Sequence, residues 1–246
     1  MIERFEAQMR SMQMLSRAQE VTANNLANIN TPGFKGSNLF FKLYNQNIDG
    51  VTTQTAVPMQ LPNLSQGELE LTGNTFDVAI TGEGFFMVES DGRQLLTRDG
   101  RFGMSTDGYL INNDGAKVIG SSGPIQIPEY FQASDLYGND ATLVISKDGT
   151  IYINDQVHEK IALVDVKNPA MLKRMGDSYF VVENSNAIKE AESAELMHGY
   201  YENGNVNVLM ETVDMMRNMQ LFESQQKALA TTDETLTSAI NSLGRF

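Results

Sequence analysis

The last segment of the chain carries the strictest pattern in the sequence, an apolar row in which each member follows the one before it by seven residues. The row consists of Val208, Met215, Phe222, Leu229, Leu236 and Leu243. Met219 and Ile240 each follow a member of this row by four residues, whereas the equivalent positions elsewhere are Thr212, Gln226 and Asp233. This spacing predicts an amphipathic helix that packs along another helix, with Asn207 as its N-cap and Gly244 as its stop. A helix of about 55 Å cannot bury its own seam, so we expect a helical partner.

A second amphipathic helix is expected over residues 2–29. Ile2, Phe5, Met9 and Met12 recur at spacings of three and four residues, and Leu15, Ala18 and Thr22 continue the stripe. Methionine supplies much of this stripe and packs adaptably, so the stripe does not specify one partner. The residues alone leave two arrangements open: the two helices pair within one subunit, or they form a coiled-coil layer between subunits of a polymer.

The run ANNLANINTPGFK, residues 23–35, ends the first helix. Asn tolerates left-handed backbone angles, Pro32 disfavours a helical Thr31, and Gly33 permits positive φ, so we expect the helix to stop near Ile29. The run has more amides than a simple turn requires, and these either brace the turn or face another chain. We take as a candidate assembly motif the residues Asn24, Asn25, Leu26, Asn28, Asn30, Thr31, Pro32, Gly33 and Phe34.

The middle of the chain changes from connector to strands. Residues 31–70 are punctuated by Gly, Pro and Asn and predict an extended connector. From Leu71 the apolar period becomes two, and Asp-Gly pairs at 91–92, 99–100, 107–108 and 114–115 predict short antiparallel hairpins. We expect the last strand at 179–182 and surface loops at 129–140 and 184–200.

These patterns predict an α+β fold that is mainly β. The expected domains are a terminal helical domain of residues 1–30 and 205–246, in which the long helices pair in a coiled-coil-like manner, the connector 31–70, and a central antiparallel β domain of residues 71–204. We predict that Asn28→Ala or Gly33→Val impairs incorporation of the subunit into an assembly more than it impairs the stability of the β domain.

Composition excludes several classes of function. The formal charge of −13 opposes binding to nucleic acid or to anionic membranes, and no apolar run is long enough to span a bilayer. The start of the chain lacks the apolar stretch of a cleaved secretory signal. Without cysteine, and with His158 and His198 far from any triad or metal-site spacing, we expect no catalytic, cofactor-binding or metal site.

Three stretches resemble the signature regions of the bacterial flagellar rod and hook family: the run 23–35, residues 71–102 (LTGNTFDVAITGEGFFMVESDGRQLLTRDGRF) and residues 204–236 (GNVNVLMETVDMMRNMQLFESQQKALATTDETL). The resemblance implies a structural subunit, not an enzyme, that polymerises with itself and with other flagellar axial proteins. It further implies export through the flagellar type III apparatus without a cleaved signal, and a place in the periplasm-spanning rod of the basal body. The terminal helices would form an inner tube with the β domain outside it.

Two alternatives stay open at this point. Within the family, the chain length favours a proximal or distal rod member over a hook-type subunit. Outside the family, the chain could be a secreted β-domain binding module with a helical oligomerising stalk. Its candidate exposed aromatics are Tyr109, Tyr130, Phe131 and Tyr137.

Overall fold

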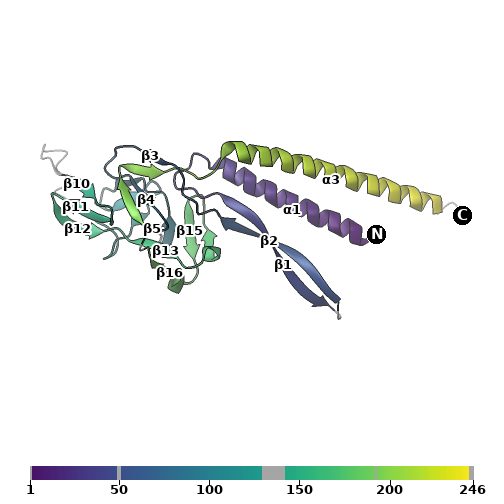
Figure 1. The fold of residues 1–246 in the computed structure, drawn as a ribbon, viewed down its shortest axis with the longest axis horizontal. Coiled ribbons are helices and arrows are strands. Elements are labelled where there is room, and N and C mark those ends of the chain that lie inside the picture. The colour runs from purple at the N-terminus through teal and green to yellow at the C-terminus, as the bar shows by residue number, and fades with distance from the viewer. Residues whose placement is uncertain (1, 49–50, 129–141, 192, 244–246) are drawn as a thin grey trace. The chain divides into compact units, whose positions relative to one another are not determined.

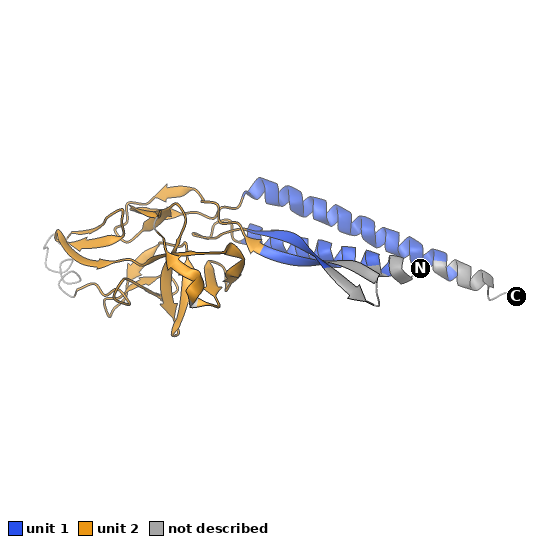
Figure 2. Ribbon diagram, turned by 60° about the horizontal axis from the view of Figure 1, so that its bottom comes forward, with its two compact units in different colours: residues 1–27, 37–60, 207–246 blue, residues 28–36, 61–206 orange. Residues whose placement is uncertain are grey.

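The computed structural model describes the whole chain except residues 1, 49–50, 129–141, 192 and 244–246. As the sequence predicts, the fold is α+β and mostly strand, with one helix near each terminus (Figure 1). The chain divides into two compact units, shown in Figure 2. We call residues 1–27, 37–60 and 207–246 the helical unit, and residues 28–36 and 61–206 the β unit.

The helical unit contains two long helices and a two-stranded sheet. Helix α1 (Ile2–Ala27) packs along α3 (Val208–Leu243) and also contacts β1 (Ser37–Ile48). Strand β1 pairs with β2 (Val51–Pro62), and because only two residues separate them the pair is antiparallel. Within the predicted connector 31–70, residues 37–48 and 51–62 therefore form two strands that pair with each other.

The ends of α3 and α1 follow local chemistry. Asn207 caps α3 as predicted: its carbonyl accepts from the Glu211 amide at 3.0 Å, and its side chain accepts from the Met210 amide at 3.1 Å. Helix α1 ends at Ala27, two residues before the predicted stop. The expected stop at Gly244 lies outside the described residues.

The β unit is built from antiparallel strands. Its largest sheet runs β14-β15-β6-β5-β9-β8-β7, with β13 paired to β5 and β16 paired to β13. The bounds are β5 (Phe85–Ser90), β6 (Arg93–Thr97), β7 (Phe102–Met104), β8 (Leu110–Asn112), β9 (Lys117–Val118), β13 (Leu163–Val166), β14 (Leu172–Arg174), β15 (Tyr179–Val182) and β16 (Ile188–Glu190).

Smaller sheets flank this one. They are β10 (Leu143–Ile145) with β11 (Thr150–Ile153) and β12 (Gln156–Lys160), β4 (Val78–Thr81) with β17 (Glu195–His198), and β3 (Leu69–Leu71) with β18 (Tyr200–Glu202). Short 3₁₀ turns occupy Pro169–Met171 and Ser185–Ala187. One apolar core connects the largest sheet with the β10–β11–β12 and β4–β17 sheets, with Phe86 packed edge-to-face on Phe102 and Ile125 and Ile151 almost fully buried.

The Asp-Gly pairs have two different roles. Asp91 and Gly92 both have positive φ, 51° and 72°, and form the two-residue turn between β5 and β6. The expectation of a reversal at Asp99-Gly100 is wrong, because β6 and β7 are not paired with each other. A Cβ on Gly100 would lie 1.7 Å from the Val78 carbonyl oxygen, so this glycine permits close approach of two backbones.

A further Asp-Gly pair, Asp148-Gly149, stands where β10 turns into β11. The Asp148 carboxylate accepts hydrogen bonds from the hydroxyls of Ser146 and Thr150. These bonds lower the pKa of Asp148 to about 2, because they stabilise the charged form. The acidic side chain therefore braces its own turn.

Residues 184–200 are not the surface loop that the sequence predicts, and Tyr179–Val182 is not the last strand. Strands β16 and β17 lie in this segment, and β18 follows them. In β17, Leu196 is buried opposite Ile80 while Glu195 stays exposed. The sequence did not predict these strands because each is short, and because β17 and β18 pair with β4 and β3, which lie more than a hundred residues earlier in the chain.

Candidate functional site

The turn that follows α1 is organised by its own side chains. The Thr31 amide donates to the Asn28 carbonyl at 3.1 Å, and the Thr31 hydroxyl donates to the Asn28 side-chain oxygen at 3.1 Å. The Phe34 amide then donates to the Thr31 carbonyl at 3.2 Å. Asn28 and Pro32 are buried, whereas Asn30 is exposed. Of the amides in this motif, Asn28 thus braces the turn, as one of the two sequence hypotheses requires.

Gly33 and Phe34 seat the turn in the β unit. Gly33 has φ +67°, and a Cβ there would lie 2.1 Å from the Asp99 amide nitrogen. The Phe34 side chain is fully buried, with the Arg174 guanidinium 4.5 Å above its ring. Arg174 also donates a hydrogen bond to the Lys35 carbonyl. No residue larger than glycine fits at position 33 without displacing backbone.

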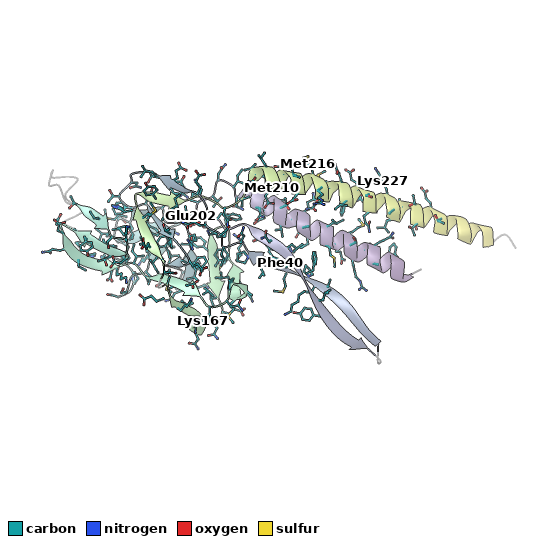
Figure 3. The ribbon with its side chains drawn as sticks, in the orientation of Figure 1. Phe40, Lys167, Glu202, Met210, Met216 and Lys227 are labelled. Carbon is teal, nitrogen blue, oxygen red and sulfur yellow. The ribbon has the colours of Figure 1, made fainter. Side chains whose placement is uncertain are left out.

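One buried carboxylate forms ion pairs with two buried cations, one of which directly follows the turn. Glu202 is fully buried, and its carboxylate lies 2.6 Å from Lys35 Nζ and 3.2 Å from Arg98 Nη1. Lys35 Nζ also donates to the Ser65 carbonyl at 2.7 Å, and Arg98 Nη2 donates to the Gly82 carbonyl at 2.6 Å. Burial lowers the pKa of Lys35, and the adjacent carboxylate opposes that shift. None of these three residues was predicted from the sequence as part of a site. Figure 3 labels Glu202.

In the helical unit, Asn25 connects three elements. Its Nδ2 donates to the Glu211 carboxylate at 2.8 Å and to the Ser37 carbonyl at 3.0 Å, while its Oδ1 accepts from the Ser37 amide at 2.9 Å. Burial raises the pKa of Glu211, and the hydrogen bond from Asn25 opposes this. Asn24 is exposed and Leu26 is half-buried. Asn25 thus ties α1 to both β1 and α3.

The face of α3 that α1 covers is mixed in character. Met215, Phe222 and Leu229 of the predicted row are half-buried. The other half-buried positions at heptad spacing are polar: Glu211, Asn218, Gln225 and Thr232. Met219 is 47% exposed and Val208 43% exposed, so neither lies on the covered face. The side chains of Ile2, Leu236, Ile240 and Leu243 are outside the described part of the structure.

Both helices keep large apolar side chains in solvent. Phe5 and Met9 of α1 are 49% and 42% exposed, whereas Met12 is half-buried. Leu209 and Met216 of α3 are 78% and 54% exposed. With Val213, which is 56% exposed, they recur at spacings of four and three residues, which places them on the side of α3 opposite its covered face. We call Leu209, Val213 and Met216 the outer stripe of α3; Figure 3 labels Met216.

The remaining candidates are two histidines and four aromatic residues. His158 and His198 each bond through Nε2 to a backbone carbonyl, and no group of metal-ligating side chains occurs in the described chain. Tyr109 is half-buried with Lys117 Nζ 4.0 Å from its ring centre. Tyr130, Phe131 and Tyr137 lie outside the described residues. Among described helices, none has the length and apolarity needed to cross a bilayer.

Comparison with known families gives three matches along the chain. Residues 5–35 match the model described as "Flagella basal body rod protein", residues 79–153 match "Flagellar hook protein FlgE/F/G D1 domain", and residues 197–243 match "Flagellar basal body rod FlgEFG protein C-terminal". The first and third of these ranges contain most of α1 and α3, and the first extends over the turn to Lys35.

Similar proteins match over nearly the full length. The flagellar basal-body rod protein FlgF of Caulobacter vibrioides is 29% identical over 94% of each chain. The flagellar basal-body rod protein FlgG of Buchnera aphidicola subsp. Schizaphis graminum is 30% identical over 88% of this chain and 90% of its own. The FlgF of Salmonella typhimurium is 30% identical over 88% of each chain.

Proposed function

The chain belongs to the flagellar basal-body rod protein family, and from this premise we propose that it is a structural rod subunit that polymerises through its helical unit. The outer stripe of α3 is the observation that carries this proposal. Three large apolar residues in line on an exposed helix face favour a contact with another protein. The exposed Phe5 and Met9 of α1 provide a second apolar surface on the same unit.

Two different apolar surfaces on one subunit suit a head-to-tail polymer. A contact between the outer stripe of one copy and α1 of the next is heterologous, and heterologous contacts that do not close generate helical filaments. In this proposal α1 and α3 pair in a coiled-coil-like manner as an inner layer, and the β unit faces outward. The polar positions between α1 and α3 support this proposal. Because the two helices bury little apolar surface against each other, much of their stabilisation would come from packing against neighbouring copies.

The proposal includes partners and location. Other flagellar axial proteins are the expected neighbours, and the basal body is the expected location. We propose that the subunit reaches it through the flagellar export apparatus, without a cleaved signal. We propose a mechanical rather than enzymatic role, since the relatives are rod proteins by name.

The test compares single added charges. Leu209→Glu and Val213→Glu should remove the subunit from purified basal bodies, because each places a carboxylate in the proposed apolar contact. Both should leave the thermal unfolding of the β unit unchanged. Gln94→Glu, which adds the same charge at an exposed position of β6, is the matched control and should incorporate normally.

Two results would refute the proposal. One is normal incorporation of both charged variants, which would exclude the outer stripe as a contact. The other is the presence of the wild-type subunit in the hook and its absence from the rod, which would favour the hook-type alternative.

A further inference from the structure

The four places where the chain passes between its two units adjoin the same part of the β unit. The passages fall after residues 27, 36, 60 and 206. On the β-unit side they are flanked by residues 28–36, 61–67 and 202–206. These three segments are distant in sequence but are hydrogen-bonded to one another, and together we call them the junction.

Asn205 bonds to two of the segments at once. Its amide donates to the Phe34 carbonyl at 3.2 Å, and its Oδ1 accepts from the Gly36 amide at 2.8 Å. Its Nδ2 donates to the carbonyls of Asn63 and Ser65, each at 2.8 Å. Every polar atom of this side chain is therefore used to hold the junction together.

Glu202 provides the charged centre of the junction. Its backbone carbonyl accepts from the Gly33 amide at 2.7 Å, and its carboxylate accepts from the Gly67 amide at 2.6 Å. The same carboxylate pairs with Lys35, from the turn, and with Arg98, which directly follows β6. Without the carboxylate, two buried cations would remain without their counter-ion, and the turn would lose its charged anchor.

We infer that Glu202 is a positioning residue that closes the junction in the free subunit, before any neighbouring copy binds. All of its partners lie in the β unit, so its contacts need no second chain. The segments of the β unit that lead into α1, β1, β2 and α3 are then held together within the β unit, and folding of that unit offsets the entropy cost of bringing them together. The benefit of a closed junction for assembly rests on the proposed rod function, whereas the closure itself does not.

Hydrogen exchange of the full-length monomer, read by mass spectrometry, tests the inference. In the wild type, amides of residues 28–36 and 203–205 should be protected to the same degree as those of β5 and β6. Glu202→Gln should speed exchange in 28–36 by about ten- to a hundredfold while β5 and β6 stay protected. Glu68→Gln, at an exposed side chain beside the junction, is the control and should change neither.

A second variant covers the case in which Glu202→Gln unfolds the whole β unit. Asn205→Ala leaves the buried charges paired, and it should speed exchange at Gly36 while leaving β5 and β6 protected. Rapid exchange of residues 28–36 in the wild type would overturn the inference. Unchanged protection of residues 28–36 in Glu202→Gln would also overturn the inference. If that variant unfolds, unchanged protection of these residues in Asn205→Ala would overturn it instead. These readouts use monomer only, so they are independent of whether the protein is found in the rod.

Discussion

Replacing Gly33 by alanine should destabilise the β unit more than the same change at Gly73, which has a comparable backbone angle. A non-glycine residue in the left-handed region costs about 1–2 kcal/mol. At Gly33 the new Cβ would also lie 2.1 Å from the Asp99 amide nitrogen and 2.5 Å from the Arg98 carbonyl carbon, and these are backbone atoms that cannot rotate away. Overpacking of this kind adds about 1–3 kcal/mol.

Gly73 offers a matched control in the same unit. Its φ is +70°, against +67° for Gly33, but a Cβ there meets no atom within 4 Å. Gly73→Ala should therefore show the backbone cost alone, and any entropy gained by restricting the unfolded chain is the same in both variants.

Scanning calorimetry of the full chain measures the difference. For a unit of this size, about 1 kcal/mol corresponds to about 2–4 °C, so we expect a loss of about 2–8 °C for Gly73→Ala and about 4–20 °C for Gly33→Ala. Equal losses in the two variants would refute the reasoning, because they would mean that the turn does not press on the Arg98-Asp99 backbone.

Three further predictions concern other parts of the chain. Asp148→Asn should lower the free energy of unfolding at pH 7 by less than about 1 kcal/mol, since the site is exposed. The pKa of Asp148 is about 2 in the folded chain, against an ordinary value of 3.8, so the stabilisation is present above about pH 4 and is lost as the pH falls toward 2. Acid unfolding curves of the variant and the wild type measure this difference. Asn25→Ala should weaken the helical unit by about 1–3 kcal/mol, because it removes the three hydrogen bonds of a buried side chain, and reduce helical circular dichroism of the monomer. Phe222→Ala should lower the helix-unfolding midpoint of the monomer, whereas Met219→Ala, on the exposed side, should change its stability by no more than about 0.5 kcal/mol.

Sequence pattern located the helices because their ends depend on nearby residues. Asn207 caps α3 with bonds to amides three and four residues away, and the chain leaves helical geometry before Pro32. Pattern was less informative about which face of α3 meets α1. The apolar pattern predicts Met219 on this face, but Met219 is exposed. The half-buried positions include the polar residues Glu211 and Asn218, whose burial depends on which residues of α1 lie opposite them.

The buried charges show a different limit. Lys35, Arg98 and Glu202 are separated by more than sixty residues at each step, and charged residues are usually exposed, so nothing local marks them as one cluster. The sequence offers only an indirect indication of this cluster. Lys35 and Arg98 fall within the first two of the three stretches that carried the family resemblance, and Glu202 lies just before the third.

The candidate assembly motif is divided between the two units, and this changes what its residues are expected to do. Asn25 acts within the helical unit, whereas Asn28, Gly33 and Phe34 belong to the β unit. The initial hypothesis that Gly33→Val impairs incorporation more than β stability is therefore replaced: a branched side chain at this position must disturb Asp99, so the β unit should lose stability first. The residues whose substitution should separate assembly from stability are on α3, because Leu209 and Val213 are exposed and contribute little to the fold of the free subunit.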